Sequence, residues 1–278
     1  MKKISRRSFM AAAAVSVAAL ALTACGGSAS SAASSVASSA ASSEAVSSAA
    51  AADLTTVEAG KLTMATNAAF PPYEMTTDAG EFEGIDVDTA KAIAEKLGLE
   101  LQIDDMDFDA ALLSVQQGKA DIVMAGVTVT DERKAVMDFS DSYATGIQSV
   151  IVPEGSDIAS VDDLAGKKIG TQRGTTGYIY CSDDFGDENV VAYDDGLTAV
   201  QALNNGQVDA VVIDNAPAQE FVAANPGLKV LDTSYAEEDY AIGMAKGSAL
   251  EDAVNKALEE LKADGTLQAI VDKYINAN

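Results

Sequence analysis

Two stretches of the chain repeat one pattern and lead to groups of opposite charge. Residues 111–126 (ALLSVQQGKADIVMAG) and 199–214 (AVQALNNGQVDAVVID) each combine a short helical segment, a glycine and an aspartate that opens an apolar strand. A glycine after the last helical turn supplies a left-handed cap, and a continuous apolar run is typical of a buried parallel strand. The first copy leads to Arg133, and the second ends on Asp214.

The positions of Arg133 and Asp214 predict a ligand that carries both charges. In an open α/β sheet, ligands bind outside the carboxyl ends of the strands, which is where both repeats place these groups. A guanidinium and a carboxylate that face each other across a cleft can pair with the carboxylate and the ammonium group of one small molecule. We therefore expect the ligand to be an α-amino acid.

The composition argues against an enzyme and against a metal or cofactor site. The chain contains no histidine, which removes Ser-His-Asp and Cys-His catalysis and the common zinc sites. It also has no glycine-rich phosphate loop, and Cys181 has no second cysteine in the globular region with which to pair. We expect Cys181 to be a packing residue, and we expect no cofactor and no metal.

The first 25 residues have the features of an export signal. Four basic residues precede a short apolar run at 11–22, which is too short for a spanning helix. The run Leu-Thr-Ala-Cys at 22–25 resembles the bacterial lipobox, so Cys25 is expected to be lipidated. The segment Ser-Arg-Arg-Ser-Phe-Met at 5–10 resembles a twin-arginine signal, and the alternatives of twin-arginine and Sec export stay open.

A tether and a large acidic region follow the signal. Residues 26–56 are dominated by serine and alanine, and we expect them to form a flexible tether. Roughly 220 residues remain, enough for one large domain or two of about 100 each. With 43 acidic and 18 basic residues and a net charge of −25, the protein is not expected to bind nucleic acid.

The order of predicted elements indicates two lobes. Two similar β-α-β units are connected by extended runs near 143–152 and 238–245, so the chain is expected to cross between lobes twice. We expect a discontinuous first lobe at 57–147 and 238–278 and a continuous second lobe at 148–237. A cleft between such lobes closes by hinge motion around a ligand.

From Lys61 onward the chain resembles the bacterial extracellular solute-binding proteins of family 3, the receptors of polar amino-acid ABC transporters. The resemblance implies an α/β fold of the periplasmic-binding-protein-like type II, with two α/β lobes joined by two extended hinge connectors. It is carried by motifs in family order at 66–74 (TNAAFPPYE), 84–88 (GIDVD), 106–109 (MDFD), 125–133 (AGVTVTDER), 138–141 (DFSD), 174–176 (GTT) and 264–266 (DGT).

The resemblance assigns the two charged ends of the amino acid. It implies that Arg133 binds the α-carboxylate through two parallel hydrogen bonds, which a planar guanidinium can provide and lysine cannot. Thr128 and Thr176 are expected to add hydroxyl or backbone N–H donors to the same carboxylate. Asp214 is expected to bind the α-ammonium, together with the carbonyl of Gly126.

The resemblance also implies a site for the ligand side chain, without identifying the ligand. Phe70 and Phe108 match an aromatic pair that holds this side chain. Glu74 and Asp109 could supply a carboxylate, although we expect both to be solvated. Glutamine, cystine or cysteine, histidine, arginine and lysine all stay open as ligands. The remaining positions carried over as ligand-binding are Asn67, Gln172 and Thr175.

The function that the resemblance implies is transport rather than catalysis. The protein is expected to be a monomer outside the cytoplasm, anchored to the cell membrane through lipid on Cys25, which delivers its amino acid to ABC permease subunits. The alternative is a secreted cyclohexadienyl (prephenate or arogenate) dehydratase-like enzyme on the same fold, with Glu74 or Asp109 as its acid or base.

Overall fold

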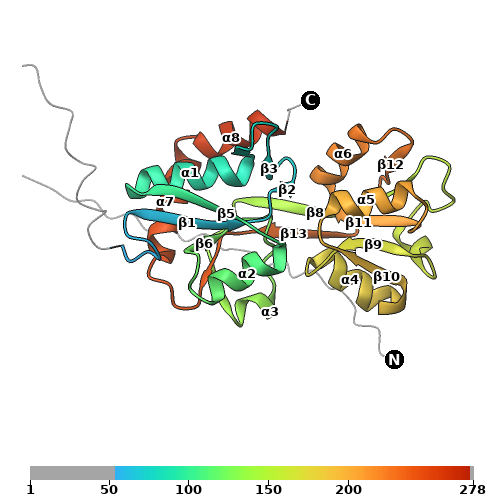
Figure 1. Cartoon of the computed structure of the whole chain (residues 1–278), viewed down its shortest axis with the longest axis horizontal. Helices are drawn as coiled ribbons and strands as arrows, with labels where there is room; N and C mark the ends of the chain where they lie inside the picture. Colours follow the sequence, from blue (N-terminus) through green and yellow to red (C-terminus); the bar gives the residue numbers. More distant parts are fainter. Residues whose placement is uncertain (1–53, 276–278) are drawn as a thin grey trace, which may run out of the picture. The chain divides into compact units, whose positions relative to one another are not determined.

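The computed structural model describes residues 54–275. The predicted signal peptide, Cys25 and nearly all of the predicted tether therefore lie outside the described residues. The described part combines two large β-sheets and one small one with helices packed on the large sheets (Figure 1). The α/β fold class predicted from the sequence is confirmed. Within the described part of the chain, no helix has the length and apolar character needed to cross a membrane.

The first sheet has the strand order β5-β1-β6-β14-β7. Strands β5 and β6 run parallel to β1, whereas β14 enters antiparallel from a distant part of the chain. Helices α1, α7 and α8 pack against one another, and α2 packs on β1 and β14. The elements are β1 (Lys61–Thr66), β5 (Glu100–Asp105), β6 (Ile122–Val123), β7 (Met137–Phe139), β14 (Gly243–Ala245), α1 (Ile85–Leu97), α2 (Phe108–Gln116), α3 (Asp131–Lys134), α7 (Glu251–Ala263) and α8 (Thr266–Tyr274).

The central strands β1 and β6 of the first sheet are buried on both faces, whereas the edge strand β5 is polar and partly exposed. In β1, Leu62 and Met64 belong to the core beneath α1 and α7, while Ala65 faces the core formed with α2. Successive side chains of a strand point to opposite faces, so one short strand contributes to two cores. Figure 1 shows α1 and α8 on one side of this sheet and α2 on the other.

The second sheet has the order β10-β9-β11-β8-β12, and β13 also pairs with β8. Helices α5 and α6 lie on one face and α4 on the other (Figure 1). The elements are β8 (Ala144–Pro153), β9 (Ile169–Gln172), β10 (Val190–Tyr193), β11 (Ala210–Asp214), β12 (Leu228–Val230), β13 (Ala236–Tyr240), α4 (Thr176–Phe185), α5 (Gly196–Asn204), α6 (Asn215–Ala224) and the short turns η1 (Val161–Leu164) and η2 (Asp187–Asn189).

The repeated sequence pattern produces the same local structure twice. Gly118 and Gly206 both adopt left-handed backbone conformations, with φ of 65° and 67°, just after α2 and α5. The aspartate that follows accepts a hydrogen bond at 2.8 Å from the backbone N–H of the neighbouring strand: Asp121 from Thr63, and Asp209 from Lys168. The predicted order of helix, glycine, aspartate and strand is therefore confirmed in both copies.

The first copy differs from the prediction in the length of its strand. Strand β6 pairs with β1 only at Ile122 and Val123, whereas β11 continues to Asp214. After β6 the chain leaves the sheet and forms the loop that carries Gly126 and Thr128, because these residues line a pocket rather than extend the sheet.

The two extended connectors pair with each other. Strands β8 and β13 are antiparallel from Ala236↔Gln148 to Tyr240↔Ala144. They lead from the first sheet into the second and back again. The predicted lobe boundaries at 147/148 and 237/238 fall within these two strands, and they stay a prediction.

A small third sheet supports the start of α1. Strands β2 (Ala69–Phe70), β3 (Glu74–Thr76) and β4 (Phe82–Glu83) form a meander that ends at Gly84. Gly84 precedes α1 with φ of 135°, and a side chain there would overlap the backbone carbonyl of Tyr73. By contrast, Gly80 also has a positive φ, of 80°, but a Cβ added there would have no atom within 4 Å.

We predict that Gly84→Ala lowers the free energy of unfolding by about 2–4 kcal/mol, because the backbone strain and the clash with Tyr73 act together. Gly80→Ala, which introduces the strain alone, should cost about 1 kcal/mol. Urea unfolding of both variants measures the difference. Equal losses would show that close packing at Gly84 contributes nothing to stability.

Candidate functional site

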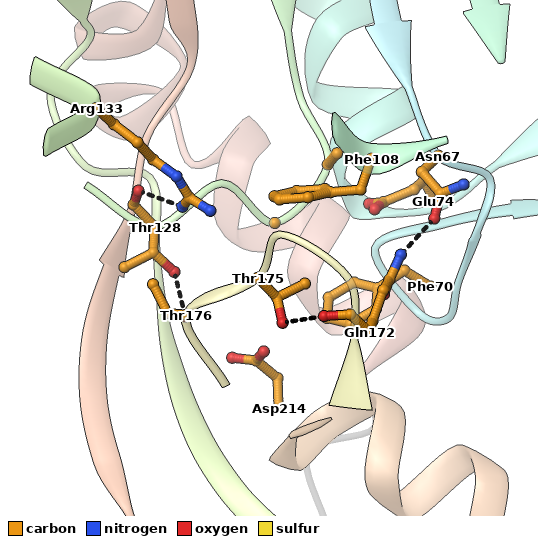
Figure 2. Close-up of a pocket in the computed structure, with 12 residues that line it drawn as sticks. Asn67, Phe70, Glu74, Phe108, Thr128, Arg133, Gln172, Thr175, Thr176 and Asp214 are labelled. Carbon is orange, nitrogen blue, oxygen red and sulfur yellow. Dashed lines mark hydrogen bonds between the residues drawn. The ribbon is translucent and has the colours of Figure 1, made fainter. Parts of the chain in front are cut away.

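One pocket collects all the residues that the sequence predicted as ligand-binding. Ala125 lines it as well, and so does Glu74, which Figure 2 shows among the labelled side chains. Cys25, the predicted lipidation site, lies outside the described residues. The predicted residues that line the pocket are Asn67, Phe70, Phe108, Gly126, Thr128, Arg133, Gln172, Thr175, Thr176 and Asp214.

The ends of strands from both large sheets position these side chains. Asn67 follows β1 of the first sheet, whereas Gln172 and Asp214 are the last residues of β9 and β11 in the second. All three strands are in parallel arrangements within their sheets. The pocket therefore lies where the sequence repeats place it, outside the carboxyl ends of the strands.

Arg133 is held by backbone carbonyls contributed by two segments. Its Nη1 donates to the carbonyl of Thr128 at 2.8 Å, and its Nη2 donates to that of Gly174 at 3.1 Å. Its Cζ lies 5.3 Å from the ring centre of Phe108. Among the ion pairs of the described residues, none involves Arg133.

A guanidinium has five N–H donors, so these contacts orient Arg133 and leave donors for an anion. Burial lowers its pKa, and the negative charge of Glu238 opposes that shift. Because the pKa of arginine begins far above neutrality, the group stays a cation. The site thus contains an oriented positive charge that no carboxylate contacts in the described structure.

Asp214 is a buried carboxylate with only one of its oxygens hydrogen-bonded. Its Oδ2 accepts from Nε2 of Gln148 at 2.8 Å, while Oδ1 is buried with no hydrogen-bond partner in the described residues. Burial raises the pKa of Asp214 to about 7; the interaction with the hydroxyl of Tyr240 opposes this shift, and the charge of Glu238 adds to it. A cationic group placed beside Oδ1 would favour the ionised carboxylate.

Two amide side chains bridge the opposite side of the pocket. Nε2 of Gln172 donates to Oδ1 of Asn67 at 2.9 Å, and Nδ2 of Asn67 donates to the carbonyl of Met106 at 2.9 Å. Figure 2 shows this bridge on the far side of Phe108 from Arg133. The rings of Phe70 and Phe108 are buried at 7% and 5% exposure, so the pocket has two apolar walls.

Glu74 corrects one prediction from the sequence. We expected it to be solvated, but it is 1% exposed and lines the pocket near Asn67 (Figure 2). Burial raises its pKa well above the usual range, and the neighbouring Asp86 raises it further. No local pattern marks this burial, because α1, which carries Asp86, covers Glu74 only in the folded chain. Asp109 is exposed and lies outside this pocket, as expected.

Several polar groups of the site serve the fold as well as the pocket. The hydroxyl of Thr175 accepts from the N–H of Tyr178 and donates to the carbonyl of Gln172, so it caps α4. The N–H of Gly126 donates to Asp86 at 3.0 Å.

The described residues include no cluster of side chains arranged to hold a metal ion. Sequence reasoning also missed Gln148 and Glu238, which contact the site from strands β8 and β13.

Comparisons with known proteins identify the family of this chain. A family model described as bacterial extracellular solute-binding proteins, family 3, matches residues 62–277. A probable histidine-binding protein of Neisseria gonorrhoeae is 35% identical over 272 residues, which cover 95% of this chain and 94% of the relative.

Solved structures with the same fold are also similar in sequence. The arginine-, lysine-, histidine-binding protein ArtJ of Geobacillus stearothermophilus matches with a TM-score of 0.75 and 34% identity, over 78% of this chain and 96% of that one. An ancestral arginine-binding protein is 43% identical, with TM-scores of 0.75 and 0.74 for its glutamine-bound and arginine-bound structures. They match over 78% of this chain and over 98% and 99% of those chains. The type II periplasmic-binding-protein fold is thereby confirmed.

The raised pKa of Asp214 predicts a pH-dependent effect of Asp214→Asn on stability. Because this pKa rises from 3.8 to about 7 on folding, the folded state takes up a proton that the unfolded state does not hold. The resulting stabilisation is complete below about pH 4 and is lost progressively as the pH rises from there through about 7. Relative to the parent protein, the asparagine variant should gain about 2–3 kcal/mol in unfolding free energy between pH 5 and pH 8.

Urea unfolding of both proteins at pH 5, 6.5 and 8, without added amino acids, measures this gain. The other titrating groups are common to the two proteins, so their contributions largely cancel in the difference. A difference that stays constant with pH would show that Asp214 titrates at its ordinary value.

Proposed function

Since the chain belongs to the bacterial extracellular solute-binding proteins of family 3, we propose that its pocket captures an amino acid with a basic side chain, foremost L-arginine. The observation that carries this proposal is the set of three ionisable groups lining one pocket. Arg133 suits a carboxylate, Asp214 suits an ammonium group, and Glu74 provides a second acidic group for the side chain.

The backbone of the amino acid would bind between Arg133 and Asp214. The guanidinium is oriented by two carbonyl acceptors and can form two parallel hydrogen bonds with an α-carboxylate. The unpartnered Oδ1 of Asp214 can accept from the α-ammonium. Gly126 lines the same pocket, and its carbonyl is proposed to share the ammonium.

The side chain of the ligand would lie between Phe70 and Phe108 and reach Glu74. Aromatic faces cover an aliphatic chain and attract a cation beside them. Glu74 is buried with its Oε2 unpartnered in the described residues, and its raised pKa favours a proton on it when no cation is present. A guanidinium or ammonium group would compensate the ionised carboxylate, because an opposite charge nearby favours ionisation.

The similar proteins support a basic ligand. ArtJ is described as binding arginine, lysine and histidine, and the relative from Neisseria gonorrhoeae as binding histidine. The ancestral protein was solved with arginine and with glutamine. Glutamine is therefore the second candidate ligand, since a protonated Glu74 can donate to its amide oxygen.

The hydrogen bonds across the pocket support a hinge mechanism. Gln172 contacts Asn67, and Arg133 contacts the Gly174 carbonyl, so segments from both large sheets are joined directly. We place the hinge in β8 and β13, between a lobe of 57–147 with 238–278 and a lobe of 148–237. Closure around the ligand would present the closed form to an ABC permease.

The remaining parts of the proposal concern the cellular setting. Residues 1–25 would direct export, Cys25 would carry the lipid anchor, and 26–56 would hold a monomeric binding domain outside the cytoplasm. No catalytic step is proposed. The dehydratase alternative has less support, because the similar proteins are described as binding proteins.

A thermal-shift screen against the twenty amino acids, ornithine, citrulline and cystine tests the proposed function. L-Arginine is expected to raise the melting temperature most, because its charged groups match all three ionisable groups of the pocket and its planar guanidinium suits the slot between the aromatic rings better than the ammonium group of lysine or ornithine. A ligand at a hundred times its dissociation constant adds about 2.7 kcal/mol of stability. Arg133→Ala should remove the shift. The absence of a shift with every compound would contradict amino-acid binding.

Glu74→Gln should change ligand preference rather than abolish binding. We expect its affinity for L-arginine to fall by about tenfold or more, since the variant loses an ionic partner for the guanidinium. Affinity for L-glutamine should change by less than about threefold, because an amide can still bond to an amide. Isothermal titration calorimetry with both ligands measures this, with the exposed Glu81→Gln as the matched control. Equal losses for the two ligands would remove Glu74 from the side-chain site.

A further inference from the structure

A buried glutamate lies behind the pocket and joins three elements. Glu238 of β13 is 6% exposed. Its Oε2 accepts hydrogen bonds from Oγ1 of Thr176 at 3.0 Å, Nε2 of Gln148 at 3.0 Å and Oγ1 of Thr128 at 3.3 Å. Glu238 is not among the residues that line the pocket. One carboxylate oxygen is thus the common acceptor for groups from α4, from β8 and from the loop after β6.

These contacts, together with the 3.4 Å contact between the two threonine hydroxyls, in which either could donate, limit the donors that the threonines can offer to a ligand. A hydroxyl has one proton, so a hydroxyl that donates to Glu238 cannot donate to a second anion at the same time. The backbone N–H groups of Thr128 and Thr176, by contrast, stay available for a ligand. Thr176 is the first residue of α4, where N–H groups lack partners within the helix. The N–H of Thr128 has no acceptor among the described residues.

The start of a helix favours an anion at its exposed N–H groups, which agrees with a carboxylate binding near Thr176. The residues on either side of Thr128 form backbone hydrogen bonds with β13 and the residue that follows it. The N–H of Val129 donates to the carbonyl of Asp239 at 3.0 Å, and the N–H of Ala241 donates to the carbonyl of Val127 at 3.1 Å. The carbonyl of Thr128 then accepts from Arg133. The position of Thr128 therefore affects two donors at once, its own N–H and the guanidinium.

We propose that Glu238 is a positioning residue for the α-carboxylate site. It takes the hydroxyl protons of Thr128 and Thr176 and thereby orients the backbone of both segments, so that their N–H groups converge with Arg133 on the ligand. Glu238 itself does not touch the amino acid. This inference rests on the proposed function, since it assigns a role within amino-acid binding.

The proposal predicts that Glu238 and Thr176 act through one shared contact. Glu238→Gln replaces a charged acceptor by a weaker neutral one, and Thr176→Val removes the hydroxyl while keeping the shape and the backbone N–H. Each should weaken L-arginine binding about tenfold. The double variant should also lose about tenfold rather than a hundredfold, because the second change removes nothing further. Glu237→Gln, on the exposed side of the same strand, is the matched control and should retain parental affinity.

Titration calorimetry of the four variants and the parent protein separates the outcomes, with thermal unfolding as the check on folding. If Glu238→Gln binds within twofold of the parent, Glu238 has no positioning role. If the double variant loses about a hundredfold, the Thr176 hydroxyl contacts the ligand directly and the proposal is wrong. Should Glu238→Gln fail to fold, a parental affinity in Thr176→Val alone would overturn it. Failure of the parent protein to bind any amino acid in the screen would instead contradict the proposed function.

Discussion

The cost of burying charge is the constraint on which the rest of this structure depends. Arg133, Asp214 and Glu74 line one small pocket, and each would be more stable in water than in an apolar interior. The protein reduces this cost in different ways. Backbone carbonyls accept from Arg133, an amide donates to Asp214, and burial raises the pKa of both acids. The free protein therefore holds a site whose unsatisfied groups match a small molecule of complementary charge.

The two large sheets are arranged so that neither can complete this site alone. The first contributes Asn67, Phe108 and Arg133 from segments around its strand ends, and the second contributes Thr176 and Asp214. The paired connectors β8 and β13 are more than links between the sheets, because they carry Gln148 and Glu238 beneath the charged groups. Motion in these strands would change lobe position and site geometry together.

Much of the fold could be predicted because it follows from local rules. The glycines and aspartates of the two repeats recur with the same backbone bonds, and the extended runs predicted near 143–152 and 238–245 overlap β8 and β13. The small sheet β2-β3-β4 and helix α6 were not predicted. Strands of two or three residues have too little periodicity to read, and α6 begins directly at the end of β11 with a proline inside its first turn.

By itself the sequence determined the α/β class, the repeated unit and the positions of Arg133 and Asp214, because cap residues and apolar periodicity are local properties. The other residues that line the pocket were predicted from the motifs shared with the family. Only the tertiary structure decided how those residues are partnered. Glu74 is buried beside Asp86 of α1, the Thr175 hydroxyl caps α4, and Glu238 accepts hydrogen bonds from segments far apart in the chain. Burial and hydrogen-bond partners depend on contacts between distant segments, and no local pattern encodes these.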